Sequence, residues 1–69
     1  MLRQSTPTLN MVEEEYNRGN IEASFTIINK ILQMEGENLK NLYWAALVLY
    51  EMEDFDGCEK KINKSIKLL

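Results

Sequence analysis

The chain has no histidine, and its 69 residues include a single cysteine, Cys58. Without histidine it lacks the commonest general base at neutral pH and the commonest metal ligand. Cys58 has no second thiol or imidazole with which to form a zinc site or a Cys–His nucleophile. An internal disulfide is impossible, which fits a reducing compartment. These absences argue against an enzyme, a metal or another cofactor, and they predict a cytoplasmic protein.

Glycine, proline and long apolar runs are also scarce. Three glycines and one proline leave little room for long loops, and no glycine-rich phosphate-binding loop is present. No stretch approaches the roughly 18–20 apolar residues of a membrane-spanning helix. Residues 1–5 contain one basic residue and no apolar segment, so we expect no signal peptide. The net charge of −3 argues against nucleic acid, which attracts basic surfaces. We therefore expect neither a membrane nor a nucleic acid as partner.

The densest apolar stretch runs from Asn38 to Met52 and contains the only tryptophan, Trp44, and two of the three tyrosines. From Leu42 to Tyr50 every residue is apolar or aromatic. A helix that is apolar on nearly all sides needs neighbours on several of them. With 45% hydrophobic and 28% charged residues, the chain has the composition of one small globular domain organised around this helix.

Apolar residues recur at spacings of three and four along the chain, which predicts four helices at about 7–18, 21–35, 39–52 and 55–68. In the third helix, Trp44 is expected to point away from the core, with Val48 to one side of the buried face. The predicted core-facing residues are Leu9, Val12, Tyr16, Ile21, Phe25, Ile28, Ile31, Leu32, Leu42, Ala45, Ala46, Leu49, Phe55, Cys58, Ile62, Ser65, Ile66 and Leu69.

Capping residues separate these helices. Thr6 and Pro7 predict the first helix start, with a hydroxyl at the N-cap and proline at the first helical position. Gly19 suits the left-handed position that ends a helix, and Gly36 ends the second one. The predicted N-caps of the last three helices are Asn20, Asn38 and Asp54. Such short turns fold the four helices into two antiparallel hairpins, preceded by a flexible lead-in at residues 1–6.

The two hairpins repeat with a period of 34 residues and no gap. Gly19-Asn20-Ile21-Glu22 aligns with Glu53-Asp54-Phe55-Asp56. The same offset pairs Tyr16 with Tyr50, Ser24 with Cys58, Ile28 with Ile62, Lys30 with Lys64, Leu32 with Ile66 and Met34 with Leu68. A fixed period of this length indicates a stack of like helical units.

A gapless 34-residue period over helical hairpins resembles the tetratricopeptide repeat (TPR) family. The turn of Gly19, Asn20 and a large residue is similar to the family's, as is a small residue early in each second helix. The sequence departs from the family pattern at Glu53, at Val12 in the first helix, and at Gly36 where a proline often stands. The resemblance covers about residues 5–69, with repeat 1 at about 5–38 and repeat 2 at about 39–69. It implies an all-α, TPR-like stack of two hairpins forming one domain over residues 7–69.

The resemblance also implies a concave groove lined by the first helix of each repeat. It predicts a non-enzymatic protein-interaction module that binds a partner helix or peptide there. Aromatic residues are favoured anchors at such interfaces. The predicted partner-binding residues are Leu9, Glu13, Tyr16, Asn17, Tyr43, Trp44, Leu47, Tyr50 and Glu51.

A structural assembly unit is the alternative function. Uncapped ends of short repeat stacks are sticky. The chain is then a homo- or hetero-oligomeric subunit that associates through its apolar faces, in the manner of small secretion chaperones. Two charge clusters carry no function in this interpretation. Glu13–Glu15 form a solvated helix face, and the lysines from Lys60 to Lys67 match the dipole at the end of the last helix.

Overall fold

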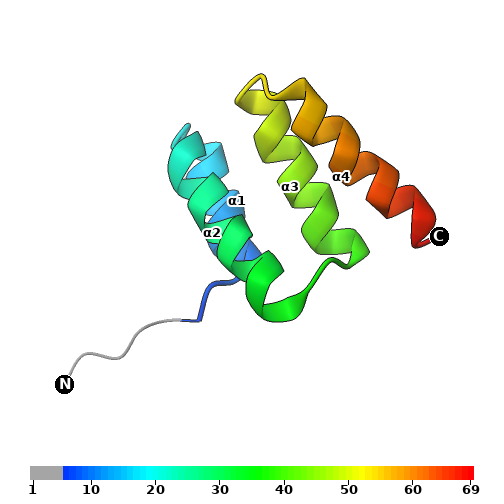
Figure 1. Ribbon diagram of the computed structural model, residues 1–69. Helices are drawn as coiled ribbons and strands as arrows, with labels where there is room; N and C mark the ends of the chain where they lie inside the picture. Colours follow the sequence, from blue (N-terminus) through cyan, green and yellow to red (C-terminus); the bar gives the residue numbers. More distant parts are fainter. Residues whose placement is uncertain (1–5) are drawn as a thin grey trace.

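The computed structural model describes residues 6–69, and over this range the protein is all-α. The helices are α1 (Leu9–Asn17), α2 (Ile21–Glu35), α3 (Leu39–Glu51) and α4 (Phe55–Lys67). They form two antiparallel hairpins, α1–α2 and α3–α4 (Figure 1). The predicted fold class is confirmed, and the predicted helix bounds agree with the structure to within two residues. Residues 1–5, which make up most of the predicted flexible lead-in, lie outside the described residues.

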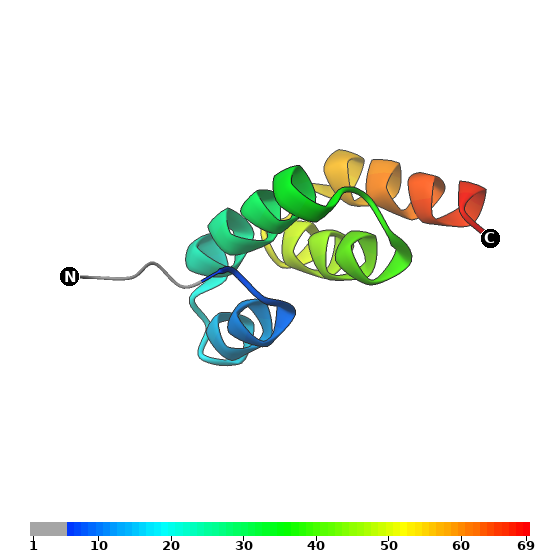
Figure 2. The same ribbon diagram turned by 90° about the horizontal axis from the view of Figure 1, so that it is seen from below.

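The helices lie in two layers, with α1 and α3 on one side and α2 and α4 on the other (Figure 2). Helix α3 is the central element because it packs against α1, α2 and α4. Within residues 6–69, α4 packs against α3 alone. The first hairpin is therefore covered by α3. The side of the second hairpin that faces away from the first has no described helix on it and faces solvent.

The first helix begins two residues later than predicted. Its N-cap is Thr8, whose Oγ1 accepts a hydrogen bond from the Met11 N–H at 3.3 Å, so the prediction of Thr6 was wrong. Pro7 precedes the cap and is not the first helical residue. Both threonines can cap a helix. The helix starts where its apolar face, beginning with Leu9, reaches the core.

The two hairpin turns have the same geometry, 34 residues apart. Gly19 has a φ of 86°, which confirms the predicted left-handed position, and Glu53 has a φ of 63°. In both turns two N–H groups donate to carbonyls of the last helical turn, an arrangement that satisfies the helix end. The bonds are Gly19 N to Tyr16 O at 3.1 Å, Asn20 N to Glu15 O at 2.8 Å, Glu53 N to Tyr50 O at 2.9 Å and Asp54 N to Leu49 O at 2.9 Å.

Two of the three predicted N-caps of the later helices form side-chain caps. Asn38 accepts from the Asn41 N–H at 2.9 Å, and Asp54 accepts from the Gly57 N–H at 3.0 Å. Asn20 occupies the N-cap position, but its amide donates to the Glu15 carboxylate at 2.8 Å instead. The first turn of α2 therefore has no side-chain cap.

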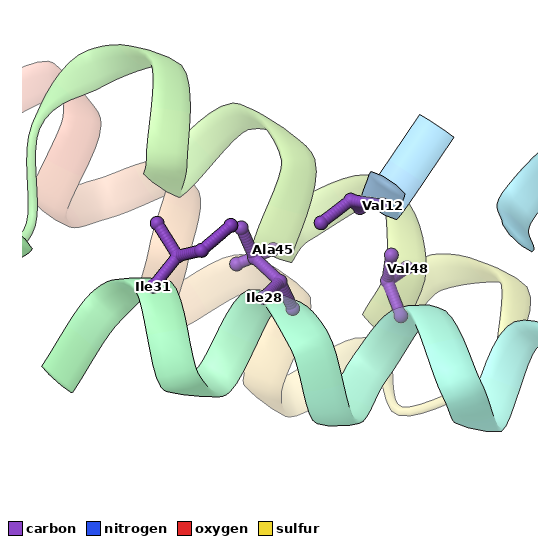
Figure 3. Packing of buried hydrophobic residues seen from close by; sticks show 5 residues of the cluster. All are labelled: Val12, Ile28, Ile31, Ala45 and Val48. Carbon is purple, nitrogen blue, oxygen red and sulfur yellow. The ribbon is translucent and has the colours of Figure 1, made fainter. Parts of the chain in front are cut away.

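The core lies where α3 crosses the first hairpin. Val12 of α1, Ile28 and Ile31 of α2, and Ala45 and Val48 of α3 form one buried cluster (Figure 3). Two polar side chains are buried beside it, and both are satisfied. Ser24 Oγ donates to the Val12 carbonyl at 2.9 Å, and the Asn41 side-chain amide donates to the Gly36 carbonyl at 3.0 Å.

Predictions about burial were wrong for residues of α3 and for residues 55–69. Val48 is fully buried, and Trp44 is half-buried against the core cluster and does not point away from it. The reason is that α1 and α2 cover a wider arc of α3 than one helical face. Conversely, no residue of α4 is buried, and the predicted core residues Phe55, Ile62, Ile66 and Leu69 are exposed. Their helix has α3 on one side and no second helix on the other.

Candidate protein-interaction surface

The solvent-facing side of the α3–α4 hairpin contains two adjoining apolar hollows, and we call their lining residues the outer face. The hollow next to the start of α3 has a volume of about 440 Å³, and the next one has about 360 Å³. Tyr43, Ala46 and Ile62 line both hollows and separate them. The outer face consists of Leu39, Lys40, Tyr43, Ala46, Leu47, Tyr50, Cys58, Ile62, Ser65, Ile66 and Leu69.

Large apolar side chains on the outer face are open to solvent. The exposed fraction is 60% for Tyr43, 57% for Tyr50 and 59% for Ile66. Tyr50 also packs edge to face on Phe55, with the ring centroids 5.6 Å apart. Among residues 6–69, Lys40 is the only charged residue that lines either hollow. The outer face is therefore a continuous apolar surface that contains few polar or charged groups.

The 34-residue period relates the outer face to the core. Val12, Ser24, Ile28 and Ile31 of the first hairpin are each at most 1% exposed, and the core cluster joins three of them to Ala45 and Val48 of α3. Their equivalents in the second hairpin all line the outer face. The pairs are Val12 and Ala46, Ser24 and Cys58, Ile28 and Ile62, and Ile31 and Ser65. The outer face is thus the counterpart of the surface that α3 covers on the first hairpin.

An aromatic cluster lies between α1 and α3. The Trp44 ring packs edge to face with Tyr16 at 5.8 Å and with Tyr43 at 6.0 Å between centroids. The Tyr16 hydroxyl donates to Glu51 Oε2 at 3.2 Å. Burial raises the pKa of Tyr16, and the nearby Glu51 carboxylate raises this pKa further. The phenol therefore stays protonated and keeps donating over the physiological pH range.

The predicted partner-binding residues fall into separate sets. Tyr43, Leu47 and Tyr50 lie on the outer face. Tyr16, Trp44 and Glu51 form the aromatic cluster, which Tyr43 joins to the outer face. Leu9 packs against the core and lines a hollow with Leu39, Asn41 and Leu68, whereas Glu13 and Asn17 are exposed on α1. That these residues bind a partner stays a prediction.

Sequence reasoning assigned several residues of the outer face to the core. Ala46, Cys58, Ile62, Ser65 and Ile66 have the spacing of a buried helix face, so their periodicity predicted burial. The signal for their exposure lies in the 34-residue offset between the two hairpins. Their equivalents in the first hairpin need α3 as a cover, and no described helix follows α4 to cover them in the same way.

A second, polar cleft runs between α2 and α4, with a volume of about 510 Å³. Lys60, Lys61, Lys64 and Lys67 line it, and its floor residues Ile28, Ala45 and Leu49 are buried. At one end, Lys64 Nζ lies 2.8 Å and Lys61 Nζ 3.6 Å from Glu37 Oε2. The hydrogen bond from Lys64 holds the pKa of Glu37 below its usual value. Because four lysines line it, this cleft is more polar and more charged than the outer face.

Two further findings concern the described part of the chain. Over residues 6–69, no group of three or more His, Cys, Asp or Glu side chains is placed to hold a metal ion. No helix in the same range is long and apolar enough to cross a membrane. Comparison of the chain with protein-family models, with curated proteins and with solved structures finds no match.

Proposed function

We propose that this protein is a non-enzymatic, cytoplasmic interaction module that binds a helix of a partner protein on its outer face. The observation that carries the proposal is the pair of adjoining apolar hollows between α3 and α4, ringed by exposed Tyr43, Tyr50 and Ile66. Contiguous exposed apolar patches mark interaction sites on small proteins. The resemblance to the TPR family supports the same conclusion, because such units stack through their apolar faces.

In a domain of this size, the burial of a few side chains is a sizeable part of the stability. Burying one large aliphatic or aromatic side chain contributes about 1.5–3 kcal/mol. The whole stability of a domain is only about 5–15 kcal/mol. Tyr43, Ile62 and Ile66 are 46–60% exposed, so a helix that covered all three would bury about half of each side chain and contribute roughly 2–5 kcal/mol, a sizeable fraction of that stability. Such a surface is expensive to leave in water, and a partner helix removes that cost.

The aromatic cluster supports a second candidate, a peptide groove between α1 and α3. Tyr43 is exposed beside Trp44, and Glu51 offers a carboxylate at the same edge. Trp44, however, is already packed against Tyr16 and the core. This surface therefore leaves less apolar area for a partner than the outer face does. The outer face is the better-supported site.

Selection from a displayed library of 18-residue helical peptides tests the proposal. Peptides that bind the wild-type chain are expected to lose at least tenfold in affinity for Ile66→Lys. They should retain affinity for the matched control Met34→Lys. Both residues are apolar and about 60% exposed, but Met34 lies on α2, outside both hollows. Circular dichroism of each variant confirms that the helices remain folded.

The same experiment can overturn the proposal. Peptides that bind both variants as tightly as they bind the wild type would place the site elsewhere. Loss of binding in Tyr16→Ala and Glu51→Ala, with Ile66→Lys unaffected, would favour the groove between α1 and α3. Sedimentation at several concentrations distinguishes a module that binds other proteins from one that associates with itself.

A further inference from the structure

We infer that the partner helix lies on the outer face in the register in which α3 lies on the first hairpin, and that it inserts two large apolar side chains one helical turn apart. This inference rests on the proposed function, because it specifies the partner of the same surface. The template is inside the molecule. On the first hairpin, Ala45 and Val48 of α3 pack among Val12, Ile28 and Ile31 (Figure 3).

The orientation of the partner follows from the repeat. Helix α3 runs antiparallel to α2 and packs against both helices of the first hairpin. A helix related to α3 by the same step would run antiparallel to α4 and parallel to α3. Its first turn would then lie near Leu39 and Lys40, at the start of α3. An acidic residue in that turn would face Lys40, and it would also suit the positive end of the partner's helix dipole.

The size of the inserted side chains follows from the differences between the hairpins. Val12 is replaced by Ala46 and Ile31 by Ser65, so two branched side chains are replaced by small ones. Those two residues line the larger hollow, and Ala46 lines the smaller one as well. A side chain the size of alanine or valine, as in α3, would leave this space empty. Leucine, methionine or phenylalanine would fill it, and filled space is favoured because interiors are closely packed.

The spacing of the inserted side chains follows from the hollows. Along α3, one hollow extends from Leu39 to Ala46 and the next from Tyr43 to Tyr50, so the second is displaced by four residues. Four residues make about one helical turn, or about 5–6 Å along the axis. Residues i and i+4 of a partner helix lie on one face at this distance. The partner is therefore an amphipathic helix with Leu, Met or Phe at i and i+4, a spacing one residue wider than that of Ala45 and Val48, by which α3 packs on the first hairpin.

A second copy of the chain fits this surface less well. In a symmetric dimer the same surface meets itself, with residue i of one copy against residue j of the other, so the exposed Tyr43, Tyr50 and Ile66 of one copy would enter the hollows of the other. Such a dimer places both helices of a hairpin on the outer face, whereas the first hairpin is covered by the single helix α3. Continuity with the interface that α3 already makes on the first hairpin therefore favours a separate helix.

The test uses a synthetic 18-residue helical peptide built from Ala, Glu, Lys and Gln, with Leu at two positions four residues apart and Glu in the first turn. The control peptide has Ala at both Leu positions. Fluorescence anisotropy is expected to show at least tenfold tighter binding of the Leu peptide by the wild-type chain. Equal affinity for the two peptides would overturn the inference.

A matched pair of protein variants locates the contact. Ser65→Leu fills the larger hollow and is expected to weaken binding of the Leu peptide at least tenfold. Thr26→Leu is the control, since both hydroxyls donate to the carbonyl four residues earlier, Ser65 to Lys61 and Thr26 to Glu22. Thr26 lies on α2 and lines neither hollow. Unchanged affinity of a folded Ser65→Leu variant would overturn the inference.

The failures of the two proposals can be told apart. If library peptides bind the outer face by the Ile66→Lys criterion but the Leu peptide does not bind, the inferred register is wrong and the proposed function stands. If no peptide binds there, both proposals fall. If the wild-type chain sediments as a dimer that Ser65→Leu dissociates, the occupant is a second copy, which also overturns the inference.

Discussion

The first hairpin buries Val12, Ile28 and Ile31 almost completely, whereas no residue of α4 in the second hairpin is buried. The two hairpins nevertheless share the same turn, with the same hydrogen bonds and a left-handed residue at the same position. The hydrogen bonds and the backbone geometry of the turn therefore form the second hairpin as well as they form the first. What differs is the covering helix, since α3 lies on the first hairpin and no described helix lies on the outer face.

This difference shows how burial is divided between two hairpins with the same turn geometry. Equivalent residues have equivalent positions in their own hairpins, but the next unit decides whether they are core or surface. Helix α4 packs against no described helix other than α3, so it should be the first part of the described chain to open. A partner helix on the outer face would give α4 the second neighbour that α2 already has. The following predictions test this comparison, from the largest expected effect to the smallest.

The pair Ile28 and Ile62 gives the largest contrast. Both are isoleucines at equivalent positions, but Ile28 is 0% and Ile62 is 46% exposed. Ile28→Ala should lower the free energy of unfolding by about 2–5 kcal/mol, because it leaves a cavity in the core. Ile62→Ala should cost only about 1 kcal/mol, because much of its side chain is already in water. Urea unfolding of both variants measures the difference, and equal losses would mean that the outer face is covered in solution.

Trp44 gives the next largest effect. Its side chain joins α3 to Tyr16 and packs against the core cluster, so Trp44→Ala should destabilise the fold by about 1.5–3 kcal/mol. The equivalent position in the first hairpin is Asn10, which is exposed on α1. Asn10→Ala should change stability by no more than about 0.5 kcal/mol. If Trp44→Ala left the thermal melting curve unchanged, Trp44 would be free to bind a partner, as its sequence pattern predicted.

The two left-handed turn residues should respond in opposite directions. Gly19→Val should cost about 1–2 kcal/mol, because a β-branched residue resists a φ of 86°. Glu53→Gly should be neutral or stabilising by up to about 1 kcal/mol, since it removes the strain of a non-glycine residue at a φ of 63°. Thermal melting of both variants tests whether the turns are equivalent. A loss of stability in Glu53→Gly would show that the carboxylate has a role the turn geometry does not explain.

The elements of this fold could be predicted from the sequence because the signals for them are local. Helix bounds depend on apolar spacing and on caps within three residues, and Gly19, Asn38 and Asp54 behave as those rules require. Thr6 and Thr8 show the limit of such rules. Both are competent caps, and the tertiary contact of Leu9 decides between them.

The candidate site could be predicted only in part. The aromatic and aliphatic residues of α3 outside its predicted core face included Tyr43, Leu47 and Tyr50, and the structure places all three on the outer face. Periodicity could not reveal that Ile62 and Ile66 belong there too. An apolar helix face indicates that the helix packs against something. It does not indicate whether another helix of the same chain packs there. Trp44 and Val48 show the converse, because two helices of the first hairpin cover more of α3 than one face.

The smallest expected effect concerns the link between α4 and the loop before α3. Glu37 pairs with Lys64 and Lys61, and all three side chains are partly exposed, so the pair contributes little to stability. The pKa of Glu37 is lowered in the folded state, chiefly by the hydrogen bond from Lys64. Its contribution is therefore present at neutral pH, where the carboxylate is ionised, and it is lost as the pH falls through the lowered pKa. Glu37→Gln should destabilise the protein slightly at pH 7 and not at all at strongly acidic pH.

Two controls separate this ion pair from a general effect of charge. Glu59→Gln removes the same charge from an exposed residue of α4 that takes part in none of the ion pairs found within residues 6–69. Because it leaves the ion pairs of Glu37 intact, it should have little effect on stability at pH 7. High salt should reduce the effect of Glu37→Gln at pH 7, because it screens exposed charges. Amide hydrogen exchange gives the most sensitive readout, since faster exchange should be confined to the later turns of α4. Faster exchange throughout α1 and α2 as well would show that α4 unfolds together with the core. The two hairpins would then differ in the burial of their side chains but not in their local stability.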